Sequence, residues 1–177
     1  MGGVEDLRWD EVREYFNPDT MGALPDLYVP NAVVEDWQVI LDLVRTRGWQ
    51  WQYTRGDEAL PLPTATEIFE RPADAETVSL KVWPSPGTHA IFRFMSETEI
   101  DFDVDLRELQ DQEGVDTLCA LLHAIGEELG KPVLMTSEGG SPEHPVLGFE
   151  PTLGKVVVFA DPTPAASPRR ADDRSQS

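Results

Sequence analysis

Apolar residues recur at helical spacing in two long segments of the chain. In residues 32–47 the recurring residues are Val33, Trp37, Ile40 and Val44, with Val34 and Leu41 beside them. In residues 113–129 they are Val115, Leu118, Leu122, Ile125 and Leu129, with Cys119 and Leu121 beside them. Steps of three and four residues place each set on one face of a helix. Both segments are therefore predicted to be helices that pack on a core.

The residues that flank these segments fit helix ends. Asn31 is the expected N-cap of the first helix, and Gly48 is its expected end. Gly130 is the expected end of the second helix, because glycine adopts the left-handed conformation that often ends a helix. A weaker pattern over residues 4–16 predicts a short first helix.

Strands are predicted where apolar and polar residues alternate. The segments are 49–54, 77–83, 90–94, 97–106, 132–136, 146–149 and 155–159. The turn at 84–87 joins the second and third of these segments as a hairpin, and 97–106 is the expected neighbouring strand. Helices and strands are mixed without a regular βαβ order. The pattern predicts an α+β fold, a mainly antiparallel sheet with two principal helices packed on one face.

The domain organisation follows from length and from two breaks in the pattern. Residues 161–177 contain no apolar residue larger than Ala or Pro, so we expect a disordered C-terminal tail. Residues 55–72 hold three prolines and are predicted to be a long irregular connection. The remaining length suits one domain, so residues 4–160 are predicted to form a single α+β domain.

Charge is the strongest compositional signal. The 177 residues include 33 Asp and Glu against 14 Lys and Arg, which gives a net charge of −19. This excess disfavours direct binding to nucleic acid or to anionic membranes and favours a basic protein partner. No apolar run reaches the roughly 20 residues of a membrane helix, and we expect a cytoplasmic protein. A single cysteine, Cys119, excludes an internal disulfide bond and a cysteine zinc cluster.

Acidic residues occupy alternate positions of the segment 97–106. We call Glu97, Glu99, Asp101, Asp103 and Asp105 the acidic stripe. In a strand these five side chains share one face, while the residues between them point to the core. Aligned carboxylates repel one another and lower stability. Two interpretations remain open: the acidic stripe is a solvated face that keeps the protein soluble, or it binds a cationic surface of a protein partner.

The same residues partly match a calcium-binding loop. Asp101, Asp103 and Asp105 match the opening of an EF-hand loop. The sixth and twelfth positions of such a loop require Gly and Glu, and this chain has Leu106 and Gln112 there. We therefore predict that the protein requires no metal, and no organic cofactor is indicated.

Catalytic and aromatic signals are weak. The segment 138–144 brings an acid, Ser141 and His144 close together, but it matches no G-x-S-x-G elbow, HExxH helix or P-loop. The other two histidines, His89 and His123, belong to no recognisable motif. The aromatic residues of 49–54 (Trp49, Trp51 and Tyr53) resemble a base-stacking surface, but core packing explains them better in so acidic a chain.

One resemblance bears on function. The segment 101–109 (DFDVDLREL), the helix up to Leu129 and the segment 130–139 (GKPVLMTSEG) resemble small acidic immunity proteins of bacterial polymorphic toxin systems. The likeness covers residues 97–160 as an order of elements and as acidity. It implies a non-enzymatic cytoplasmic protein that binds a co-produced toxin and occludes its active surface.

Two other classes stay open. An acidic secretion chaperone for an effector would more often be a dimer with an exposed apolar groove. A small hydrolase or ligand-binding enzyme would use the 138–144 loop. The sequence does not determine the oligomeric state.

Overall fold

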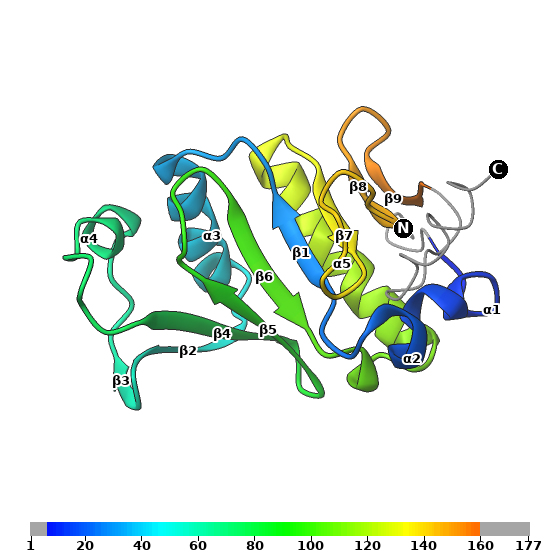
Figure 1. Ribbon diagram of the computed structural model, residues 1–177, viewed down its shortest axis with the longest axis horizontal. Coiled ribbons are helices and arrows are strands. Elements are labelled where there is room, and N and C mark those ends of the chain that lie inside the picture. Colours follow the sequence, from blue (N-terminus) through cyan, green and yellow to red (C-terminus); the bar gives the residue numbers. More distant parts are fainter. Residues whose placement is uncertain (1–6, 160–177) are drawn as a thin grey trace, which may run out of the picture.

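A nine-stranded antiparallel sheet organises the protein (Figure 1). The computed structural model describes residues 7–159. The strands are β1 (Asp26–Val29), β2 (Gln50–Arg55), β3 (Glu58–Leu60), β4 (Val78–Ser85), β5 (Thr88–Arg93), β6 (Ile100–Val104), β7 (Val133–Thr136), β8 (Leu147–Glu150) and β9 (Lys155–Val158). Their order across the sheet is β3-β2-β4-β5-β6-β1-β7-β8-β9, and every neighbouring pair is antiparallel. The α+β prediction with a mainly antiparallel sheet is confirmed.

The two principal helices are α3 (Val34–Thr46) and α5 (Gln112–Leu129), as predicted. Both lie against the same face of the sheet, behind the strands in Figure 1. The predicted Asn31 cap is wrong, because α3 begins after Val33, whose backbone N–H donates to Asp36 Oδ2 at 3.0 Å. At the start of α5 the carboxylate of Asp111 accepts from the backbone N–H of Gly114 at 2.8 Å. The expected end at Gly130 is confirmed, with φ of 67°.

Shorter elements depart from the sequence prediction. The expected helix over 4–16 is present as α1 (Trp9–Val12) followed by the 3₁₀ helix η1 (Arg13–Phe16). Its residues 4–6 lie outside the described residues, as does the predicted tail 161–177. Three further elements are α2 (Pro18–Met21), α4 (Ala65–Phe69) and the 3₁₀ helix η2 (Leu106–Glu108).

The prediction that residues 55–72 form an irregular connection is wrong. This segment contains β3 and α4. A capping box begins α4: the backbone N–H of Thr64 donates to Glu67 Oε1 at 2.9 Å, and the backbone N–H of Glu67 donates to Thr64 Oγ1 at 3.2 Å. The T-x-x-E spacing of these two residues is visible in the sequence and is a signal for the start of this helix.

One hydrophobic cluster extends from Val12 to Val156 and fills the space between the sheet and its helices. Trp37 of α3 is fully buried, with its ring centroid 4.7 Å from that of Phe94. Tyr53 is also buried, and Trp49 and Trp51 are partly buried and pack against the cluster. The predicted core role is confirmed for Tyr53, and for Trp49 and Trp51 only in part. None of the helices within residues 7–159 is long and apolar enough to cross a membrane.

Strand register determines which side chains face away from the helices. In β1, Leu27 and Val29 belong to the core, so Asp26 and Tyr28 lie on the opposite face. Asp26 is directly opposite Asp103 of β6, and Tyr28 is directly opposite Asp101. We call the face of the sheet that points away from α3 and α5 the outer face.

Candidate functional site

The acidic stripe is shorter than predicted. Only Asp101 and Asp103 lie within β6; Glu97 is in a turn, Glu99 precedes the strand, and Asp105 follows it. The predicted strand 97–106 is therefore wrong at both ends. The predicted alternation is confirmed within β6, where Ile100, Phe102 and Val104 are buried in the core.

The two carboxylates within β6, Asp101 and Asp103, are only partly exposed. β6 lies in the middle of the sheet, between β5 and β1, so its side chains are flanked on both sides. The side chain of Asp103 is 18% exposed. Carboxylates in such a position lose part of their hydration, which disfavours the charged form.

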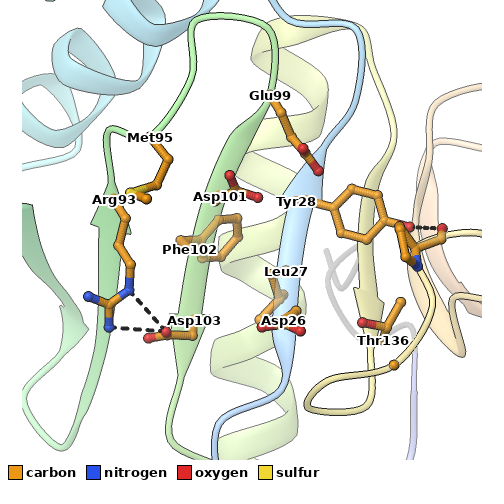
Figure 2. A pocket seen from close by; sticks show the side chains of 12 residues that line it. Asp26, Leu27, Tyr28, Arg93, Met95, Glu99, Asp101, Phe102, Asp103 and Thr136 are labelled. Carbon is orange, nitrogen blue, oxygen red and sulfur yellow. Dashed lines mark hydrogen bonds and ion pairs between the residues drawn. The ribbon is translucent and has the colours of Figure 1, made fainter. Parts of the chain in front are cut away.

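The outer face is hollowed beside β6 into a cavity of about 310 Å³. We call it the acidic cavity. Four carboxylates line it, together with one arginine, one tyrosine and one methionine: Asp26, Glu99, Asp101, Asp103, Arg93, Tyr28 and Met95. Figure 2 shows Asp101 and Asp103 on β6 between Arg93 of β5 and Asp26 and Tyr28 of β1. Of the acidic stripe, Glu99, Asp101 and Asp103 meet here, whereas Glu97 and Asp105 are not among the lining residues.

The arginine that lines the acidic cavity, Arg93, forms an ion pair with Asp103. Arg93 is directly opposite Asp101 in the strand register. Its Nε and Nη2 atoms nevertheless donate diagonally to Asp103 Oδ2, at 3.3 and 3.2 Å (Figure 2). Burial still raises the pKa of Asp103, although Arg93 opposes this shift.

Asp101 is left without a cationic partner. It makes no hydrogen bond or ion pair with any residue in the described part of the chain. Burial, the neighbouring Glu99 carboxylate and then Asp26 raise the pKa of Asp101 to about 6. A carboxylate in these surroundings would be stabilised by any cation that enters the acidic cavity.

The loop 137–145 forms one wall of the acidic cavity and is held in place by β1. The hydroxyl of Tyr28 donates to the carbonyl oxygen of Pro142, and the backbone N–H of Gly139 donates to Asp26 Oδ2 at 3.2 Å. Burial, with a smaller contribution from Glu99, raises the pKa of Tyr28. β1 therefore holds this loop in place through Asp26 and Tyr28, which also line the acidic cavity.

Asp105 has a structural role instead. Arg107 donates to both of its carboxylate oxygens at 2.8 Å, and the backbone N–H of Arg107 donates to Asp105 Oδ1 at 3.0 Å. These contacts cap η2 and hold the pKa of Asp105 below its usual value, chiefly through the side-chain hydrogen bond. Its charge is thus already neutralised within the protein.

The residues considered for catalysis do not converge. Ser141 and His144 are exposed, and the Ser141 hydroxyl accepts from the backbone N–H of Glu143 at 3.2 Å. No hydrogen bond joins the Ser141 hydroxyl to the His144 imidazole among the described residues. His89 Nδ1 lies 3.0 Å from a carboxylate oxygen of Glu108, in a different part of the sheet.

Metal binding has no visible basis in residues 7–159. Within that range no group of three or more His, Cys, Asp or Glu side chains is arranged to hold a metal ion. The four carboxylates of the acidic cavity are spread over two strands and a preceding loop residue, so they line a hollow and do not surround a point.

Four of the lining residues named above were not predicted from the sequence: Asp26, Tyr28, Arg93 and Met95. The alternation of Asp26, Leu27, Tyr28 and Val29 is the available signal for β1, but it spans only four residues between two prolines.

Comparison of the chain with protein-family models, with curated proteins and with solved structures found no match.

Proposed function

We propose that this protein is a non-enzymatic, cytoplasmic protein-binding module, and that it acts as an immunity protein that neutralises a basic toxin by occlusion. In this proposal the acidic cavity receives a lysine or arginine side chain of the partner. The observation that carries the proposal is Asp101, a half-buried carboxylate that has no cationic partner among residues 7–159 and whose pKa is raised by burial and by the acidic neighbours Glu99 and Asp26.

Like-charge repulsion supplies the driving force. Asp26 and Asp103 are directly opposite across β1 and β6, a pairing that is unfavourable for equal charges. Arg93 relieves this repulsion at Asp103 only. A cation between Asp101, Glu99 and Asp26 would relieve the rest, and its attraction is stronger in a partly desolvated cavity than at the open surface. An arginine suits the site best, because its guanidinium donates in parallel to paired carboxylate oxygens.

Charge and apolar contact have separate roles in the proposal. The net charge of −19 accelerates the encounter with a basic partner. The lifetime of a complex depends more on packed apolar contacts. Met95 lies at the acidic cavity with 72% of its surface exposed, and its flexible thioether side chain can adapt to a partner surface.

The test compares two variants with equal charge. The cavity triple variant (Asp26→Asn, Glu99→Gln, Asp101→Asn) removes three charges and keeps the Arg93–Asp103 pair. The control triple variant (Asp10→Asn, Glu11→Gln, Glu14→Gln) removes three exposed charges from the α1–η1 segment.

The partner is recovered from the native host with the wild-type protein, identified by mass spectrometry and purified. Association and dissociation rates are then measured against ionic strength. We expect the cavity triple variant to bind at least about tenfold more weakly than the control triple variant, since each lost charged contact weakens binding by roughly that factor. Equal affinities would mean that the acidic cavity is not the contact surface.

The toxin assignment has its own test. The captured partner is expressed in a bacterial host with and without this protein. Growth arrest that co-expression of the wild type relieves, and that the cavity triple variant relieves poorly, is the expected result. A partner without any toxicity would contradict the immunity role while leaving the binding site intact.

A further inference from the structure

A second cavity lies at the other end of the sheet, between β2, β4, α4 and the connection that precedes α4. Its volume is about 500 Å³. Its walls are mostly apolar and comprise Leu60, Pro61, Leu62, Pro63, Ile68 and Val78. Figure 1 shows α4 and β3 at one end of the molecule, away from β1 and β7. Cavities of this volume, with apolar walls and a few polar groups, are typical of small-molecule sites.

A buried hydroxyl without a partner belongs to this second cavity. Tyr53 of β2 lines it and is 3% exposed. The Tyr53 hydroxyl makes no hydrogen bond with another residue of the 7–159 range. Most buried polar groups in folded proteins have a hydrogen-bond partner, so this hydroxyl indicates a group that the protein alone does not supply.

Two guanidinium groups line the same cavity. Burial raises the pKa of Tyr53, while Arg71 and then Arg55 oppose this shift, which places both cations within electrostatic reach of the hydroxyl. Arg55 is already engaged, because Glu58 lies 2.9 Å and Glu76 3.9 Å from its guanidinium.

Arg71 is the available cation. It is half-buried and donates to the backbone oxygen of Glu76, but it forms no ion pair with a carboxylate of the described residues. This is unexpected in a chain with 33 acidic and 14 basic side chains. The one acidic lining residue, Glu67, is occupied by the capping box of α4, where it accepts from the backbone N–H of Thr64 at 2.9 Å.

We propose that the second cavity binds a small apolar molecule that carries a carboxylate group. The apolar part lies between the leucine and proline walls, and the carboxylate accepts hydrogen bonds from the Arg71 guanidinium and the Tyr53 hydroxyl. A carboxylate accepts several hydrogen bonds and suits the planar donor arrangement of arginine. This site is separate from the acidic cavity and does not rest on the proposed function.

The head group is tested first, with the full-length protein and isothermal titration calorimetry. The probes are 3-phenylpropionate, 3-phenylpropan-1-ol and 3-phenylpropylamine, which share one apolar body and differ in charge. We expect 3-phenylpropionate to bind at least about tenfold more tightly than the alcohol, and the amine to bind most weakly. Equal affinities for the three probes, or no binding of 3-phenylpropionate at millimolar concentration, would overturn the proposal.

Matched variants then locate the site. Tyr53→Phe removes only the hydroxyl and keeps the buried ring, and Arg71→Gln removes the cation; thermal melting confirms that each variant is folded. The controls are Tyr28→Phe, at the acidic cavity, and Arg13→Gln, at an exposed position of η1. We expect each cavity variant to bind 3-phenylpropionate about five- to tenfold more weakly, with the controls unchanged. Unchanged affinity in either cavity variant would refute the assignment.

Discussion

The substitution Asp101→Asn should stabilise the free protein at neutral pH. Asparagine has nearly the same shape as aspartate and carries no charge, so it removes the repulsion from Glu99 and Asp26 without leaving a void. Its amide group can also donate to these neighbouring carboxylates. Most substitutions at half-buried positions destabilise a protein. An increase in the free energy of unfolding would therefore point specifically to the repulsion at Asp101.

The magnitude follows from the pKa of Asp101. Burial and the two acidic neighbours raise this pKa from 3.8 to about 6, so between these pH values the folded state binds more protons than the unfolded state. Stability therefore falls as the pH rises from about 4 to about 6. The full pKa difference corresponds to about 3 kcal/mol, and solvent screening of this half-exposed group reduces the expected effect to about 1 kcal/mol.

The assay is urea unfolding of the wild type and the variant at a series of pH values from 4 to 8. The variant should match the wild type near pH 4 and exceed it by about 1 kcal/mol above pH 7. Asp105→Asn is the internal control of opposite sign, because Arg107 lowers the pKa of Asp105 and the charge there is stabilising. If Asp101→Asn were neutral or destabilising at pH 8, the reasoning about unrelieved repulsion would fail.

Three other predictions concern packing and metal binding. Gly126→Ala should lower stability by about 1–2 kcal/mol, because a Cβ there would lie 2.1 Å from the Phe149 ring and overpacking outweighs the gain in helix propensity; thermal melting checks this, and a higher melting temperature would contradict it. Leu122→Ala should cost about 2–5 kcal/mol, since this α5 side chain is fully buried; an unchanged urea midpoint would remove Leu122 from the core. Micromolar calcium should leave the melting temperature unchanged, and a rise that a chelator reverses would contradict the absence of a calcium loop.

The long elements could be predicted from the sequence because their information is local. The apolar steps of α5 and its Gly130 end are contained in one continuous segment, and so is the alternation within β6. β1 could not be predicted in the same way. It has only four residues, and it is stabilised by pairing with β6 and β7, which are distant in the sequence. Short strands of this kind depend on tertiary context more than on their own residues.

The candidate site was predicted in part for the same reason. Glu99, Asp101 and Asp103 follow from alternation on one segment, but the environment of Asp101 depends on Asp26, which only the sheet topology brings near. The extension of the acidic stripe to Asp105 failed because Arg107, two residues further on, neutralises that carboxylate. Spacing predicts which side chains share a face, but it does not predict which charges find partners.

Asp101→Asn should also separate stability from binding. A residue kept for binding can lower the stability of the free protein, so its removal stabilises the fold and weakens the complex. If these carboxylates only kept the protein soluble, Asp101→Asn would stabilise the fold without weakening the complex. Greater stability together with weaker partner binding is therefore the combination expected of a binding site, and stabilisation with unchanged binding would favour the solubilising interpretation.

Whether a partner cation enters the acidic cavity can be read from the pKa of the Asp101 carboxyl group in the free protein and in the partner complex. It is measured by NMR titration of the side-chain carboxyl carbon. We expect a pKa of about 6 in the free protein and a clearly lower pKa in the complex, since a partner cation beside the carboxylate favours its charged form. An equally high pKa in both states would contradict the claim that a partner cation occupies the acidic cavity.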